Sequence, residues 1–215
     1  MNLIQQIFTL ASRWQHWLWI IGGLLTLAGY FGPWIDHPVG GLVVTGLDLG
    51  EYVKFLPEVR GGQITLWREG FYLPLIAVSI TFSLQVFRSQ WNYHWLTRTI
   101  LIACAIIAAL NMLPPAWTPE RMMTPEFRWQ AVAIGICLTM MAFSPFLGLL
   151  PQGFSKLCIS ILALLALWFP IRNFLKIIEP ISQLYHQPQL PGWGTYVMAI
   201  GLSLLILLCL VQSTD

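Results

Sequence analysis

The chain has 215 residues, of which 57% are hydrophobic and only 9% are charged. A soluble domain carries about a quarter charged residues, so this composition excludes an ordinary soluble protein. The formal net charge of +2 and the lack of a Lys/Arg cluster in the sequence argue against a nucleic-acid-binding protein. Apolar runs of about 20 residues match a hydrocarbon core of roughly 30 Å. The sequence therefore predicts an all-α integral membrane protein.

Six apolar runs predict transmembrane helices. They cover about residues 17–34, 71–87, 96–113, 128–150, 157–178 and 196–211. Pro145 is expected to kink or end the fourth helix, and Pro170 to kink the fifth, so that residues 171–178 lie at the membrane interface. Ala131 and Gly135 form a small-xxx-small pair on the fourth helix, a pattern typical of close helix packing.

Two Thr-Pro-Glu sequences, at residues 118–120 and 124–126, precede the fourth span. Threonine as the N-cap, proline in the first turn and a following acid together indicate a helix start. We expect the first copy to begin a short interfacial helix and the second to begin the fourth span.

The basic residues of the short connections set the expected orientation in the plasma membrane. Arg13, Arg88, Arg98 and Lys156 fall on one side, with only Asp215 as an acid. Short, basic connections are typically cytoplasmic. Both termini are therefore expected in the cytoplasm, and the long connection of residues 36–69 outside.

Residues 36–69 form the one long polar interval and hold five of the nine acids. Asp48 and Glu51 have the spacing of a capping box, which predicts a short amphipathic helix over residues 49–56. Residues 42–45 and 63–67 are β-prone and could pair as a small hairpin. The segment could be a lid over a cavity, a docking surface for another protein, or a cover over the helix ends.

If a pocket lies under this loop, five residues are expected to line its mouth: Trp34, Trp67, Trp117, Trp129 and Arg172. No catalytic, metal or nucleotide motif is found, so no cofactor is predicted. The four histidines, His16, His37, His94 and His186, fall in two pairs near opposite faces, as bis-His haem ligation requires. Polar interface roles are the favoured interpretation of these histidines.

The favoured function is a non-catalytic multi-pass subunit that packs within a larger membrane assembly, with lipid and other membrane subunits as partners. The alternatives are a solute- or lipid-binding transport component with its pocket under the 36–69 loop, and a membrane enzyme or a redox or haem protein. In size, span number and long first outer loop the chain resembles the substrate-binding membrane subunits of energy-coupling-factor transporters. This resemblance rests on no motif, and residues 17–34 lack the A-x-x-x-A pattern of those subunits, so no residue role is carried over.

Overall fold

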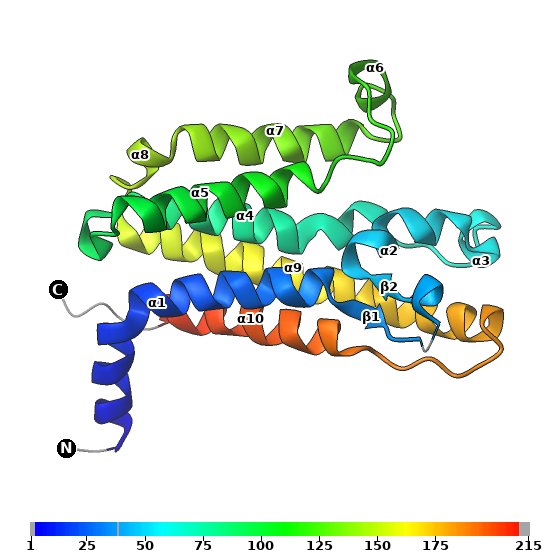
Figure 1. Cartoon of the computed structure of the whole chain (residues 1–215), viewed down its shortest axis with the longest axis horizontal. Helices are drawn as coiled ribbons and strands as arrows, with labels where there is room; N and C mark the ends of the chain where they lie inside the picture. The colour runs from blue at the N-terminus through cyan, green and yellow to red at the C-terminus, as the bar shows by residue number, and fades with distance from the viewer. Residues whose placement is uncertain (1–2, 38, 211–215) are drawn as a thin grey trace.

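The computed structural model describes the backbone of residues 3–37 and 39–210, and the side chains from residue 14 onwards. Most of the chain is helical, which confirms the all-α prediction. Figure 1 shows the longest helices side by side along the long axis of the molecule, with the 36–69 segment at one end. These helices are α1 (Leu3–Phe31), α4 (Leu73–Gln85), α5 (Trp95–Leu110), α7 (Arg128–Ala142), α9 (Gln152–Leu184) and α10 (Trp193–Leu210).

Helix α4 is the centre of the bundle. It contacts α1, α5, α7 and α9, and 12 of its 13 residues are buried. Its polar side chains turn inward too: the Ser83 hydroxyl donates to the carbonyl of Ser79 at 2.8 Å. Such a bond to the preceding turn removes the cost of burying a hydroxyl.

Helices α1 and α10 approach each other along a seam of glycines. A Cβ added at Gly29 would lie 2.6 Å from the carbonyl oxygen of Gly194, and one added at Gly201 would lie 2.5 Å from the amide nitrogen of Thr26. Only glycine permits backbones to approach this closely. The small-residue pair expected on the fourth helix does not serve this purpose, because Gly135 faces open space.

Prolines break one predicted span and leave another intact. Helix α7 ends at Ala142, and the short α8 (Ser144–Leu147) follows, so the expected break near Pro145 is confirmed. Helix α9 continues through Pro170 and Pro180 to Leu184, beyond the predicted end of the fifth run at residue 178, and the expected kink at Pro170 stays a prediction. Beyond Pro170, Asn173 donates to the carbonyl of Trp67 and the buried Phe174 ring contacts that of Trp34, and this packing offsets the missing backbone hydrogen bond.

The first α-helix within the 36–69 segment has an N-cap that differs from the predicted one. Helix α2 (Gly46–Tyr52) starts three residues earlier than expected and is followed by the 3-10 helix η2 (Val53–Phe55). Thr45, not Asp48, is the N-cap: its hydroxyl accepts from the Asp48 amide, and the Asp48 carboxylate accepts from the Thr45 amide at 2.9 Å. Asp48 is therefore the third helical residue of the capping box. Pro57 begins the next short helix, α3 (Pro57–Arg60).

A small hairpin exists, but its strands are not the predicted pair. β1 (Pro33–Ile35) pairs antiparallel with β2 (Val44–Thr45) after the 3-10 helix η1 (Gly40–Leu42). Residues 63–67 form no strand, because side chains of α9 bind their carbonyls. Lys176 Nζ donates to Thr65 O at 2.9 Å and Asn173 Nδ2 to Trp67 O at 2.7 Å. The 3-10 helix η3 (Arg68–Tyr72) then leads into α4.

Two further connections contain short helices. The 3-10 helix η4 (Ser89–Trp91) joins α4 to α5, and α6 (Pro119–Met122) lies between α5 and α7. The Thr118 hydroxyl caps α6 as expected. Thr124 does not begin α7 with a side-chain cap, because its hydroxyl donates to the carbonyl of Arg121 and the helix starts at Arg128.

Helix length alone supports fewer membrane crossings than the sequence predicts. Among the described residues, α9 and α10 are long and apolar enough to cross a membrane. Helices α5 and α7 are apolar but have 16 and 15 residues, fewer than the ~20 that a span typically needs. Two such helices are compatible with membrane insertion, although a buried core helix of a soluble protein meets the same length criterion.

Candidate functional site

A cleft of about 950 Å³ lies between the 36–69 segment and the ends of α5 and α9. We call it the insert cleft. Three parts of the chain build it: the β2–η2 region, the end of α5 with the connection after it, and the end of α9. Its lining residues are Gly41, Leu42, Val43, Val44, Leu47, Asp48, Glu51, Tyr52, Phe55, Tyr72, Leu110, Asn111, Leu113, Pro115, Leu184 and Tyr185.

The lining combines an apolar and aromatic wall with a few polar groups. Its only ionisable groups other than tyrosines are Asp48 and Glu51; it includes neither Lys nor Arg. The Asp48 carboxylate is fixed by the capping box, and Glu51 accepts a bond from the Tyr72 hydroxyl at 3.3 Å. Phe55 projects outward with 66% of its surface exposed, and the Lys54 ammonium lies 5.4 Å from its ring centroid. The cleft therefore suits apolar molecules that are neutral or positively charged.

Two tyrosines close the cleft toward α9. Burial, with a side-chain hydrogen bond to Tyr185, raises the pKa of Tyr52 to about 12. Tyr185 in turn donates its hydroxyl to the carbonyl of Leu42 at 3.1 Å. These bonds join α2, η1 and the end of α9. The Tyr52 hydroxyl therefore stays protonated at neutral pH and serves as a neutral hydrogen-bonding group.

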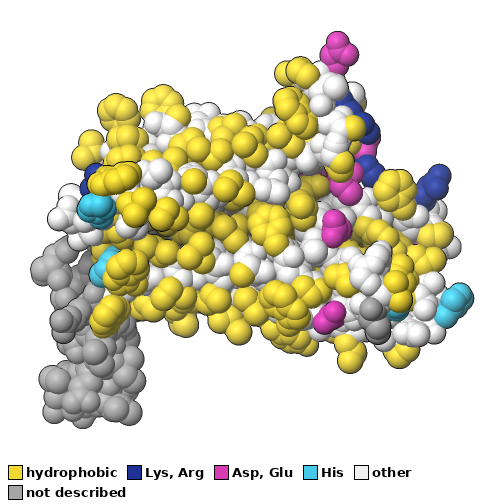
Figure 2. All heavy atoms as spheres, in the orientation of Figure 1, with side chains coloured by type: hydrophobic (Ala, Val, Ile, Leu, Met, Phe, Trp, Pro, Cys, Tyr) yellow, Lys and Arg dark blue, Asp and Glu magenta, His cyan; other side chains and the backbone are white. Residues whose placement is uncertain are grey.

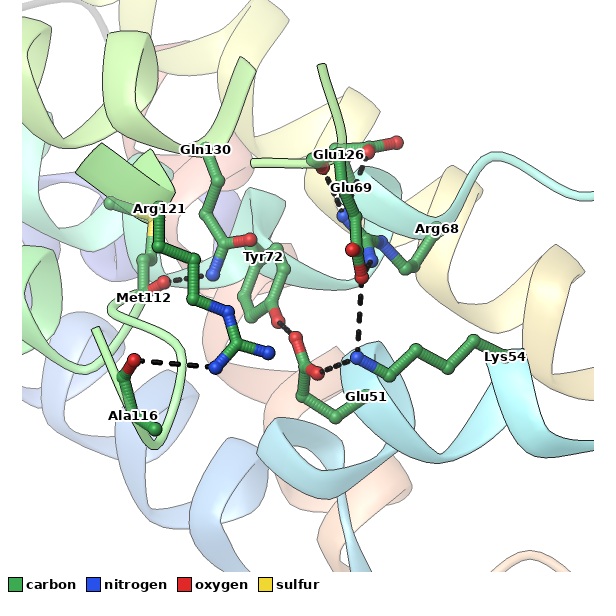
Figure 3. Close-up of polar contacts among 10 residues, drawn as sticks. All are labelled: Glu51, Lys54, Arg68, Glu69, Tyr72, Met112, Ala116, Arg121, Glu126 and Gln130. Carbon is green, nitrogen blue, oxygen red and sulfur yellow. Dashed lines mark hydrogen bonds and ion pairs between the residues drawn. The ribbon is translucent and has the colours of Figure 1, made fainter. Parts of the chain in front are cut away.

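Beside the cleft lies a balanced cluster of ion pairs (Figure 3). Lys54 Nζ contacts Glu51 Oε2 at 2.6 Å and Glu126 Oε1 at 3.3 Å. Arg68 bonds the same Glu126 carboxylate at 3.3 Å and its backbone carbonyl at 2.6 Å. Glu126 thus ties the 36–69 segment to the start of α7. Partly exposed pairs like these contribute about 0–1 kcal/mol each, so their main effect is to fix geometry.

The buried ring of Phe127 lies at the centre of this cluster. Lys54, Arg68 and Arg121 lie 5.6, 5.4 and 5.4 Å from its centroid. Cation–π contacts of this length add about 0.5–1 kcal/mol at exposed sites. Phe127 therefore connects η2, η3 and α6 through its contacts with Lys54, Arg68 and Arg121.

The structure does not gather the five residues expected at a pocket mouth. Trp34 is fully buried: its Nε1 donates to Gly29 O at 3.2 Å, and its ring meets that of Phe174 edge-on at 5.4 Å. Trp67 and Arg172 do come together, in a smaller hollow of about 350 Å³ next to α9. Trp117 and Trp129 are exposed and line neither this hollow nor the insert cleft.

The histidines make local contacts. His37 and His94 each accept a backbone amide through Nδ1, from Val39 at 3.1 Å and from Leu96 at 3.4 Å. His16 lies against the ring of Tyr93, and His186 occupies a turn at φ 53°. Within the described part of the chain, no three His, Cys, Asp or Glu side chains come close enough to hold a metal ion.

Sequence reasoning missed the aromatic residues that line the insert cleft. Tyr52 and Phe55 lie three residues apart in the predicted amphipathic helix. This spacing places both rings on one side of the helix and could have predicted one wall of the cleft. Tyr72 was assigned to a span, and Tyr185 lies in a proline-rich stretch with no regular pattern. Only the fold brings these two to the same cleft.

Comparison of the chain with protein-family models, with curated proteins and with solved structures finds no match in any of the three.

Proposed function

We propose that this chain is a non-catalytic integral membrane protein that binds a small neutral or cationic ligand in the insert cleft, as the binding component of a transport system. The cleft is the observation that carries this proposal. Its volume of about 950 Å³ falls within the range of ~300–1,000 Å³ typical of small-molecule sites. An apolar, aromatic wall with a few fixed polar groups is the usual composition of such sites.

A membrane location is supported by where the apolar side chains point. In the most apolar 18-residue windows of α9 and α10, only 28% and 39% of the residues are buried. A core helix of a soluble protein would be mostly buried. Exposed apolar surface costs about 25 cal/mol per Å² in water, whereas lipid removes this cost. Figure 2 shows hydrophobic side chains along the length of the bundle, with charged ones gathered toward its ends.

We extend this proposal to six crossings, by α1, α4, α5, α7, α9 and α10, with the insert cleft on the outer side. The shorter helices fit because α4 is shielded by its neighbours, and because the turns that flank α5 and α7 add to the apolar length. The described basic residues Arg88, Arg98 and Lys156 lie at the end opposite the cleft. The cleft end carries more basic residues, seven in all, but they are spread over longer connections together with eight of the nine acids. We assign the end with the short, basic connections to the cytoplasm, because the positive-inside rule is counted over short loops.

Partner subunits belong to the same proposal. Helices α1, α4, α5, α7 and α10 contain no Asp or Glu, the groups that usually couple transport to protons or ions. A binding component of this kind needs energy from another chain. Purification in mild detergent followed by mass spectrometry of co-purifying proteins tests this. A chain that purifies alone and monodisperse would speak against a stable partner.

The ligand proposal can be tested with two probes of similar shape and opposite charge. Tryptamine is expected to raise the melting temperature of the purified protein, and indole-3-acetate is not. Phe55→Ala should weaken tryptamine binding about two- to fivefold, because it removes an exposed cation–π contact. Trp129→Ala is the matched control, since that ring is 69% exposed and lies outside the cleft. Equal shifts by both probes, or equal losses in both variants, would refute the assignment of the cleft.

A further inference from the structure

Two hollows meet on the flank of α9, away from the insert cleft. One, of about 550 Å³, runs along the helix and is lined by Leu164, Leu167, Trp168, Ile171, Arg172, Leu175 and Lys176. The other, of about 350 Å³, is lined by Thr65, Leu66, Trp67, Phe169, Arg172, Asn173 and Lys176. Arg172 and Lys176 are the two residues common to both. They lie where the apolar hollow along α9, which we call the apolar groove, meets residues 65–67 of the 36–69 segment.

These two cations face one direction, and the nearest acid along α9 is Glu179, three residues after Lys176, whose carboxylate accepts a hydrogen bond from Gln183 at 3.3 Å. Residues four apart lie on the same side of a helix, and both side chains are exposed. Lys176 Nζ is positioned by its bond to Thr65 O at 2.9 Å and keeps two further donors. Among the described contacts, the Arg172 guanidinium makes no hydrogen bond or ion pair. Neither hollow is lined by Asp or Glu, so the junction is suited to an anion.

The apolar groove has the length of a lipid chain. Leu164 and Trp168 are more than half exposed and lie on the same face as Arg172. At about 1.5 Å per residue, Leu164 lies about 12 Å along the axis from Arg172. One leaflet of the hydrocarbon core is about 15 Å thick. A molecule with a negative head at Arg172 and a hydrocarbon tail along Trp168 and Leu164 would match both ends of the site.

We propose that Arg172 and Lys176 bind the phosphate of an anionic phospholipid in the outer leaflet, with an acyl chain in the groove along α9. This site rests on the membrane location proposed above but is independent of the insert cleft. Trp67 flanks the headgroup at the depth where aromatic rings concentrate in membranes. Through Lys176 and Asn173, α9 also binds the carbonyls of Thr65 and Trp67, so the bound lipid would brace the 36–69 segment.

The experiment compares lipid retention by the full chain in nanodiscs of phosphatidylcholine, with and without phosphatidylglycerol. Native mass spectrometry of the released protein counts the lipids that stay bound. We expect phosphatidylglycerol to be retained in preference to phosphatidylcholine. Because each basic residue near the surface contributes a similar increment, Arg172→Gln should weaken this preference about fivefold, and Arg172→Gln with Lys176→Gln about 30-fold.

Arg60→Gln with Arg128→Gln is the matched control, because it removes two exposed cations that line neither hollow. This control should retain phosphatidylglycerol as the unaltered chain does. Equal loss in the control and in the Arg172 variants would overturn the site in favour of general surface charge. Equal retention of both lipids by the unaltered chain would overturn it as well.

Inorganic phosphate added in detergent distinguishes a lipid from a soluble anion. If phosphate alone raises the melting temperature, and Arg172→Gln abolishes that rise, the occupant is a soluble anion and the lipid proposal is wrong. A chain that fails to enter nanodiscs would overturn the membrane location as well. If tryptamine does not raise the melting temperature of the unaltered chain but phosphatidylglycerol is still retained in preference, the insert cleft is refuted and the lipid site on α9 is not.

Discussion

Replacing Gly29 with alanine should force α1 and α10 apart. The added Cβ would lie 2.6 Å from the carbonyl oxygen of Gly194 and would also meet the backbone nitrogen of Met198. Ordinary contact begins at 3.4 Å, so the backbones must separate by at least about 0.8 Å (3.4 minus 2.6) to relieve the contact with Gly194, and by more to relieve the closer one with Met198. Neither obstacle is a side chain that can rotate away. The strain must therefore be relieved by moving a whole helix.

The size of the effect follows from two opposing terms. Overpacking that displaces backbone costs about 1–3 kcal/mol, and a gap of this width forfeits a quarter to a half of the dispersion energy along the seam. Alanine regains up to about 1 kcal/mol through its higher helix propensity. We therefore expect Gly29→Ala to lower the free energy of unfolding by about 2 kcal/mol.

Gly135→Ala is the control, because Gly135 lies within α7 and a Cβ there would meet nothing within 4 Å. Gly135→Ala should raise the free energy of unfolding by about 0.5–1 kcal/mol, through helix propensity alone. The assay is unfolding of the detergent-solubilised protein by increasing SDS, followed by tryptophan fluorescence. If Gly29→Ala is as stable as the unaltered chain, or if both variants lose equally, the proposed backbone contact between α1 and α10 is wrong.

Two further predictions concern the 36–69 segment. Thr45→Ala removes the hydroxyl that accepts from the Asp48 amide, and should cost about 1 kcal/mol in the same assay; an unchanged unfolding curve would show that the capping box adds nothing. The pKa of Tyr52 is raised from 10.0 to about 12, so folding favours the protonated form of its hydroxyl. The resulting contribution to the free energy of unfolding is complete below pH 10 and is lost as the pH rises through about 12. Unfolding measured from pH 9 to 12 should show a shallower loss of stability in Tyr52→Phe, and equal slopes would contradict the raised pKa.

The sequence predicted the long helices well, because apolar runs and flanking prolines are local signals. Each of the six predicted runs overlaps one long helix, and the break before Pro145 follows from the chemistry of that residue. The predicted fifth run already continued past Pro170 to residue 178, but the contacts that stabilise this part of α9 could not be predicted in the same way. Asn173 and Phe174 contact Trp67 and Trp34, which lie more than 100 residues away in the sequence.

The predicted helix cap and the predicted hairpin strands were wrong for a related reason, because both depend on contacts between distant parts of the chain. Asp48 can serve as an N-cap or as the third residue of a capping box, and local sequence does not separate these two roles. Gly46 decides between them, because its missing Cβ lets α2 start against the carbonyl of Tyr30 and the ring of Trp34. β2 pairs with β1 because Trp34 and Ile35 are buried in the core, which the alternating pattern of residues 63–67 could not reveal.

The candidate sites were only partly accessible from sequence. Trp67 and Arg172 were expected near a pocket and do share a hollow, whereas Trp34 became a core residue. The glycine seam had a readable signal: Gly22 and Gly29 are seven residues apart, as are Gly194 and Gly201. Recognising it requires knowing that the first and last helices are neighbours.

Cysteine labelling in intact cells tests most directly whether the bundle crosses a membrane with the 36–69 segment outside. In a chain whose four cysteines are replaced by alanine, Arg60→Cys and Gln90→Cys place single exposed thiols at opposite ends of the bundle. We expect a membrane-impermeant maleimide to label Arg60→Cys in intact cells, and Gln90→Cys only after permeabilisation. Equal labelling of both positions in intact cells would contradict the membrane-spanning bundle, and labelling of Gln90→Cys alone would contradict its orientation.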